Sequence, residues 1–272
     1  MDHPTEVHQS LVAQNPSDGD GMIASPAPST SNKPRIIGVD VARCLALFGM
    51  IAAHVFEIFN DDGTPTASTV IAGGRSAATF VVVAGVSVAF LSGGRTVVQG
   101  RRRTAAAAGL AVRALLVGAI GLALGLAAAG GVDVILPVYA VMFLLAIPLL
   151  GMPPRVLAGI AAAVIVLGPI LLVATADAGL PYVGADAQPT LATLVRDPFG
   201  LLVLLFITGA YPVVAYLAYL CAGMAIGRCD LSSRLVAWRL LGGGLALAVV
   251  ARVVSAVLLY PLGGLAHLAA LH

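Results

Sequence analysis

Long apolar stretches dominate the chain beyond residue 35. A membrane-spanning helix needs about 20 consecutive, mostly apolar residues. Stretches near this length, separated by short segments with Gly, Pro or charge, cover residues 36–59, 69–91, 104–129, 132–150, 155–176, 210–226 and 235–260. In lipid, such stretches form helices, because a helix satisfies its own backbone hydrogen bonds. The pattern therefore predicts an all-α fold, a polytopic integral membrane bundle of about seven transmembrane helices.

The sixth stretch is short, and another apolar run, FGLLVLLFITG, precedes it at residues 199–209. Proline lacks a backbone N–H and obstructs the preceding helical turn, so Pro212 should break any helix that reaches Tyr211. We expect residues 199–209 to form a separate interfacial or re-entrant piece. The span over 210–226 would follow it.

The two ends of the chain differ from this apolar body. Residues 1–34 are rich in Ser, Pro, Asp and Gln, a composition typical of a disordered segment. They contain no basic region followed by an apolar core, so they do not resemble a signal peptide. We expect a disordered cytoplasmic tail over 1–34, a transmembrane domain over 35–266 and a short outer tail over 267–272.

Arginine and lysine are distributed unequally between the short connecting segments. Cytoplasmic loops of membrane proteins carry an excess of these residues. With the N-terminus inside, the outer segments contain only Arg75 and Arg196, and the cytoplasmic ones contain Lys33, Arg35, Arg95, Arg101, Arg102, Arg103, Arg155, Arg228 and Arg234. The asymmetry predicts a multi-pass protein of the plasma membrane with a cytoplasmic N-terminus and His272 outside.

The composition agrees with a lipid-facing surface. Of the 272 residues, 59% are hydrophobic and only 10% are charged, whereas soluble domains are about a quarter charged. A net charge of +2 gives no reason to expect a nucleic-acid partner. The three cysteines, Cys44, Cys221 and Cys229, form neither a disulfide framework nor a set of metal ligands, so no metal is expected.

The first span, GVDVARCLALFGMIAAHVFEIF, is unusual because it contains Asp40, Arg43, His54 and Glu57. Asp40, Arg43 and His54 share one face of a helix. Glu57 lies at the edge of that face, three residues from His54 and within its reach. Each charge within a span costs at least ~2.5–3.5 kcal/mol, so four ionisable groups on one helix need an explanation.

Two interpretations of these residues stay open. In the structural one, the Asp40–Arg43 pair fastens helices together and His54 lies near the interface. In the functional one, Arg43 and Asp40 form an anion-binding site, since guanidinium matches phosphate geometry, and His54 acts as acid and base. Glu57 would then orient His54, as in a catalytic triad.

The stretch DVARCLALFGMIAAH resembles the Arg-x10-His signature of the bacterial acyltransferase-3 membrane family. The stretches RIIGVDVAR and RSAATFVVVAGVSVAFLSGG resemble the first two helices of heparan-α-glucosaminide N-acetyltransferase-like proteins. The stretch GAYPVVAYLAYLCAGMAIGRCDL is similar to a later helix of that group. The likeness extends over residues 35–231.

This resemblance implies an integral membrane acyltransferase. It would move an acetyl or other acyl group from cytoplasmic acyl-CoA, in particular acetyl-CoA, to a hydroxyl or amine of an extracytoplasmic carbohydrate of the cell envelope. Arg43 would bind the CoA side, and His54 would serve the acceptor side.

Two features depart from the family pattern. The glucosaminide acetyltransferases place their catalytic histidine in the loop after the first helix, but NDDGTPTASTVIAGG contains none. Such enzymes also have more spans than this chain. We expect that the chain is truncated, that it works as a homo-oligomer or with a partner supplying missing helices, or that catalysis has been lost.

Other polar residues have alternative explanations. Arg75 either extends to water at the interface or contacts the substrate near His54. Arg113 and Arg252 lie deeper and need partners, for which Asp133, Glu57 and Asp40 are the available carboxylates. Four tyrosines could bind a sugar or form an interfacial belt: Tyr139, Tyr211, Tyr216 and Tyr219.

Two other function classes use the same polar stripe. A transporter or permease-like protein would show helix breaks in both halves of the chain, whereas only the Tyr211–Pro212 break is evident. A non-catalytic membrane protein is the other alternative.

Overall fold

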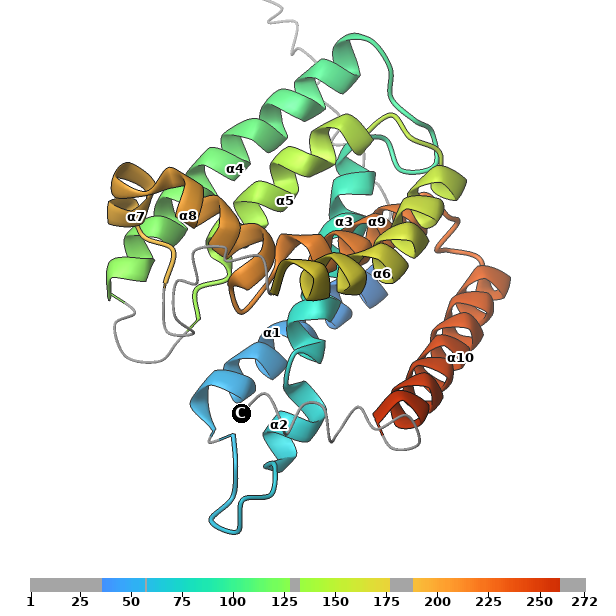
Figure 1. The fold of residues 1–272 in the computed structure, drawn as a ribbon. Helices are drawn as coiled ribbons and strands as arrows, with labels where there is room; N and C mark the ends of the chain where they lie inside the picture. Colours follow the sequence, from blue (N-terminus) through green and yellow to red (C-terminus); the bar gives the residue numbers. More distant parts are fainter. Residues whose placement is uncertain (1–35, 57, 128–132, 177–187, 260–272) are drawn as a thin grey trace, which may run out of the picture. The chain divides into compact units, whose positions relative to one another are not determined.

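The computed structural model of the chain describes residues 36–56, 58–127, 133–176 and 188–259. The predicted tails at 1–34 and 267–272 lie outside this range. The described residues form helices α1 (Ile37–Val55), α2 (Ala67–Ala72), α3 (Arg75–Leu91), α4 (Arg101–Ala127), α5 (Leu136–Leu149), α6 (Pro154–Ala176), α7 (Leu191–Arg196), α8 (Pro198–Val203), the π-helix η1 (Leu204–Thr208), α9 (Val213–Gly227) and α10 (Arg234–Leu259) (Figure 1). The all-α prediction is confirmed.

Among the described residues, fewer than seven helices are long enough to cross a membrane, so the predicted count of seven is not confirmed. Five described elements are long and apolar enough to cross a membrane: α1, α2 with α3, α4, α6 and α10. A sixth results if the bent pair over 198–227 counts as one span. The predicted span 132–150 forms only the 14-residue helix α5. Pro137 at its first turn and Pro148 near its end bracket that helix, and proline disfavours helix continuation on its N-terminal side.

A helix break lies where Pro212 predicts it. Helix α8 and η1 are followed by a bend of 60° before α9, and Pro212 is the N-cap residue of α9. The backbone N–H of Gly209 still reaches the carbonyl of Leu204, five residues back, which is the spacing of a π-helix. The run at residues 199–209 is therefore a separate piece from α9, as expected from the sequence.

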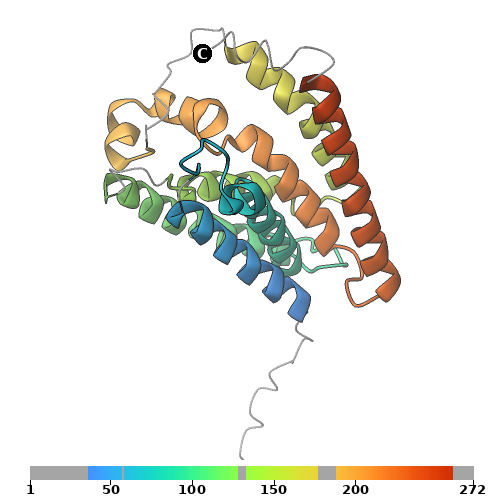
Figure 2. The same ribbon diagram turned by 90° about the horizontal axis from the view of Figure 1, so that it is seen from below.

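Helices α3 and α9 form the centre of the packing. Helix α5 contacts α9, α4 packs on α5, α6 packs on α9, and α1 packs on α3; Figures 1 and 2 show α3 and α9 side by side from two directions. Their apolar side chains form one core, whose fully buried members include Val81, Val88, Met142, Leu157, Leu220 and Met224.

Small residues allow the close approach of α3 and α9. A Cβ atom on Gly223 would collide with the backbone carbonyl of Val82, and one on Gly85 with that of Leu220. Gly227, one turn beyond Gly223, meets Ala89 and Val86 in the same way. This is the small-xxx-small pattern by which transmembrane helices pack backbone against backbone.

Helix α10 contrasts with this core. Over residues 234–257 none of its side chains is buried, and it makes no extended contact with another described helix. Its triplet Gly242–Gly244 faces open space. A helix of this length and apolarity can be stable in lipid, because all of its backbone bonds are internal.

One ion pair and two arginine side chains connect the turns at one end of the bundle. Arg95 after α3 pairs with Asp230 after α9 at 2.9 Å. Arg228 is buried and donates from Nη2 to the carbonyl of Leu150 at 2.6 Å. Arg103 donates to the carbonyl of Pro148 at 3.4 Å. Cations are favoured at a helix C-terminus, so Arg228 and Arg103 stabilise the end of α5.

Candidate functional site

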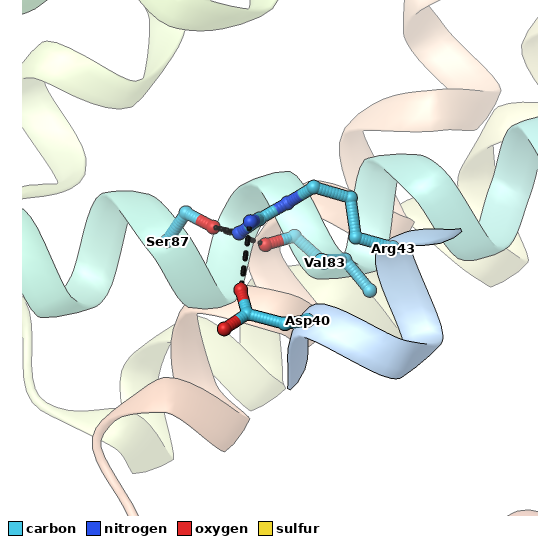
Figure 3. Close-up of polar contacts among 4 residues, drawn as sticks. All are labelled: Asp40, Arg43, Val83 and Ser87. Atoms are coloured by element: carbon cyan, nitrogen blue, oxygen red, sulfur yellow. Dashed lines mark hydrogen bonds and ion pairs between the residues drawn. The ribbon is translucent and has the colours of Figure 1, made fainter. Parts of the chain in front are cut away.

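The predicted polar pair of the first span forms at the start of α1. Nη1 of Arg43 lies 3.0 Å from Oδ1 of Asp40, one helical turn earlier. Nη2 of the same guanidinium donates to Oγ of Ser87 on α3 at 2.8 Å. The Ser87 hydroxyl in turn donates to the carbonyl of Val83 at 2.8 Å (Figure 3). Arg43 thus joins two helices through a short chain of hydrogen bonds.

This arrangement fixes the direction of the guanidinium. The hydroxyl of Ser87 has one proton, which Val83 accepts, so its lone pairs are directed to Arg43. The side chains of Arg43 and Asp40 remain 43% and 47% exposed, so the pair is accessible as well as oriented. The sequence predicted Asp40 with Arg43 but missed Ser87, because one serine in the apolar run VVVAGVSVAF gives no indication of the helix it will face.

A cavity of about 220 Å³ lies beside this pair. It is formed between α1, α3, α4 and α5, and its lining residues are Arg43, Phe80, Ala84, Ser87, Val88, Arg113 and Phe143. Its lining thus combines two arginines and a hydroxyl with apolar and aromatic side chains. Apolar walls next to charged groups lower the local dielectric constant and strengthen electrostatic interactions.

Arg113 has no acidic partner in the described part of the chain. Of the carboxylates considered for it, Asp40 pairs with Arg43. Asp133 instead accepts a hydrogen bond from Nε2 of Gln188 at 3.0 Å, and the Gln188 amide oxygen accepts from the backbone N–H of Val134. The third, Glu57, lies outside the described residues. Arg252 on α10 likewise forms no ion pair with a described residue.

His54 is exposed near the C-terminus of α1. Its Nδ1 lies 2.7 Å from the carbonyl oxygen of Met50, one turn earlier. A carbonyl oxygen can only accept, so this hydrogen bond requires the proton on Nδ1. In the neutral ring Nε2 then carries the lone pair that can accept a proton.

His54 and the cavity are separate in the structure. His54 is not among the residues that line the cavity. It lies eleven positions from Arg43, which is about 16 Å along the axis at 1.5 Å per residue. The two predicted functional residues therefore occupy opposite ends of α1, with the cavity beside Arg43.

Of the two remaining predicted site residues, Glu57 and Arg75, the structure describes only Arg75. Glu57, expected to orient His54, falls outside the described residues. Arg75 is exposed at the start of α3, and its Nη1 donates to the carbonyl of Val70 in α2. This contact places the guanidinium near the C-terminal carbonyls of α2, a favourable position for a cation.

The four tyrosines differ in burial, from buried Tyr139 through half-buried Tyr211 and Tyr216 to exposed Tyr219. Tyr139 is 6% exposed, and its ring packs edge-on against Phe80 with centroids 5.5 Å apart. Tyr211, Tyr216 and Tyr219 contact one another in sequence at 5.8 and 5.7 Å. For Tyr139 this burial excludes the belt alternative, since a belt residue lies at the membrane surface.

The family model described as "Heparan-alpha-glucosaminide N-acetyltransferase, catalytic" matches residues 35–255. This range extends from the start of α1 to within α10. The chain belongs to this family. The family resemblance inferred from the sequence is thereby confirmed. Neither a search of curated proteins nor a search of solved structures gave a match.

Family membership and the apolar helices together identify a membrane acyltransferase-type protein. The family uses acetyl-CoA as its acyl donor. Among the residues that the structure describes, no three His, Cys, Asp or Glu side chains are close enough to form a metal site.

Proposed function

We propose that this protein transfers an acetyl group from cytoplasmic acetyl-CoA to a hydroxyl or amine of a carbohydrate on the other side of the membrane. The observation that carries the proposal is the family match over residues 35–255, which includes the whole Arg43–His54 helix. The name of the family suggests the substrate class, a glucosaminide-type amine. The direction of transfer follows from the arginine bias of the loops.

Arg43 serves the donor in this proposal. It lies near the start of α1, which is the cytoplasmic end of this helix if the arginine bias of the loops sets the orientation. Asp40 and Ser87 hold its guanidinium in one orientation, and an oriented guanidinium binds phosphate oxygens with little further loss of entropy. Asp40 is thus a positioning residue for the donor site.

His54 is the general base at the other end of the helix. The acceptor oxygen or nitrogen attacks the carbonyl carbon of the thioester, and its proton passes to Nε2 of His54. The carbon–sulfur bond then breaks, and the CoA thiolate leaves with that proton. The Met50 carbonyl supports this role because it keeps the other proton on Nδ1. Glu57 would stabilise the imidazolium, and Arg75 would contact the acceptor.

The exposure of α1 bears on how the site is completed. Ala46 is its only buried residue, and His54 is open on the helix surface. Water-free acyl transfer requires an enclosed site. A second copy of the chain or a helical partner protein would supply the missing wall beside His54.

The test is acetyl transfer in membranes. Vesicles with and without the protein are supplied with acetyl-CoA labelled in the acetyl group, and envelope glycans are then extracted and counted. Label that appears in glycans only with the protein supports the proposal. Labelled protein without labelled glycan, or substrate uptake without transfer, would contradict it and favour the transporter alternative.

A further inference from the structure

The cavity beside Arg43 carries more positive charge than the known partners explain. Asp40 balances one of its two arginines, whereas Arg113 has no carboxylate among the described residues. Arg113 is twelve residues from the start of α4, about 18 Å along the helix. An arginine at such depth is costly unless a counter-charge or water compensates it.

Hydrogen-bond donors also remain available there. An arginine has five N–H groups. Arg43 uses one on each terminal nitrogen, for Asp40 and Ser87, and Arg113 makes no hydrogen bond within the described chain. The lining contains no other charged residue. The occupant that would satisfy these donors is therefore an anion with several acceptor oxygens.

We propose that Arg43 and Arg113 together form a phosphate-binding site in this cavity. Phosphate suits it because guanidinium and phosphate oxygens form paired, charge-assisted hydrogen bonds. Phe80 and Phe143 are among the apolar residues that line the cavity, and the ring of Tyr139 packs against both, with centroids 5.5 and 6.3 Å away. Arg113 is exposed and Arg43 is half-exposed, so a ligand can reach them, and apolar walls beside them lower the local dielectric constant and strengthen the attraction.

Two classes of molecule could bring such a group to this cavity. One is the diphosphate of CoA, whose uncharged pantetheine arm would continue toward His54; this source rests on the proposed function. The other is the head group of a phospholipid that enters beside α1. The simplest competing explanation is that Arg113 extends to water along the surface and binds neither.

The experiment compares variants of the full chain in phosphatidylcholine nanodiscs by calorimetry with two probes, CoA and pantetheine, which lacks phosphates. Arg113→Gln should weaken CoA binding roughly tenfold to a hundredfold, the range for a lost charged hydrogen bond. Pantetheine binding should be unchanged. Arg113→Lys keeps the charge, so its CoA affinity should lie between those of the parent protein and Arg113→Gln. Arg252→Gln removes an exposed arginine from α10 and should bind CoA like the parent protein.

A second arm tests the lipid source by native mass spectrometry after phosphatidylglycerol is added. A lipid retained by the parent and Arg252→Gln proteins, but lost from Arg113→Gln, would assign the site to a head group. The phosphate site is overturned if Arg113→Gln matches the parent in both CoA affinity and retained lipid, or if Arg252→Gln loses as much. Acetyl transfer is measured separately, so failure of the transferase proposal and failure of this site give different results.

Discussion

Helices α1 and α3 differ sharply, although they lie against each other. In α3, seven residues from Ala77 to Ala89 are buried and two backbones meet at Gly85. In α1 only Ala46 is buried, and Leu45, Phe48 and Val55 are well exposed. Yet α1 carries Asp40, Arg43 and His54, three of the ionisable groups of the candidate site.

The difference indicates that α3 contributes mainly to the stability of the bundle, whereas α1 contributes the side chains proposed for binding and catalysis. Helices α3 and α9 pack through apolar side chains and closely approaching backbones, whereas α1 contributes polar side chains at an accessible edge. Residues that bind and react have to remain accessible, and the rigid helix behind them supplies their orientation. Here Ser87 is the point where the rigid helix orients the accessible one.

The largest expected effect is a loss of acetyl transfer that leaves the packing of the core unchanged. His54→Ala should lower the rate of acetyl transfer by about 10²- to 10⁴-fold, the usual contribution of a positioned acid or base. Since His54 is exposed, the melting temperature in detergent should stay the same. Transfer rates and melting curves of purified protein measure both. Near-normal transfer by the variant would remove His54 from the mechanism.

A change in the core should have the opposite result. Gly223→Ala places a methyl group against the backbone carbonyl of Val82, where it cannot fit. Overpacking of this kind costs about 1–3 kcal/mol, so the melting temperature should fall. Gly243→Ala on α10 is the matched control, because its Cβ meets nothing within 4 Å. It should be neutral or slightly stabilising, since alanine is the better helix former. Equal melting of the two variants would contradict the packing argument.

Sequence reasoning succeeded where the signal is local. The apolar runs predicted the helices, Pro212 predicted the break before α9, and the i, i+3 spacing predicted the Asp40–Arg43 pair. Each of these depends on residues within a few positions of one another. Helical periodicity and proline geometry suffice for such predictions.

Sequence reasoning failed where a residue's contacts or burial depend on segments that are distant in the chain. Ser87 is 44 residues from Arg43. The sequence pattern of a uniformly apolar helix does not indicate which other helix it will pack against. The burial of Tyr139 has the same cause, since Phe80 comes from another helix. The count of seven spans was not confirmed because an apolar run of adequate length can fold into a helix as short as α5. Glu57 lies outside the described residues, so its predicted role stays untested.

An intermediate effect is expected at the junction of the two helices. Arg43→Lys keeps the charge but loses the planar fork that contacts Asp40 and Ser87 together, so CoA affinity should fall by about tenfold, as for one charged hydrogen bond. Ser87→Ala should weaken binding less, because Asp40 still holds Nη1. Calorimetric titration with CoA gives both values.

The same pair of variants separates the two interpretations of Arg43. If Arg43 only fastened α1 to α3, Arg43→Lys would bind CoA normally. Asp40→Asn, which leaves Arg43 without its counter-ion, would then lower the melting temperature or the amount of protein inserted in the membrane. Donor affinity and thermal stability, measured on the same preparations, therefore distinguish a binding arginine from a structural one.

The smallest effect is expected far from α1, at the Arg95–Asp230 pair between the turns after α3 and α9. The hydroxyl of Ser232 and the charge of Arg95 lower the pKa of Asp230 below its usual 3.8. A carboxyl with a depressed pKa in the folded state contributes stability above its unfolded pKa and loses it as the pH falls through the folded pKa. Asp230→Asn should thus lower the melting temperature slightly at pH 7 and by less as the pH falls below about 4. Because exposed ion pairs contribute little, a large shift at pH 7, or one that persists unchanged at acidic pH, would show that Asp230 has a structural role beyond its charge.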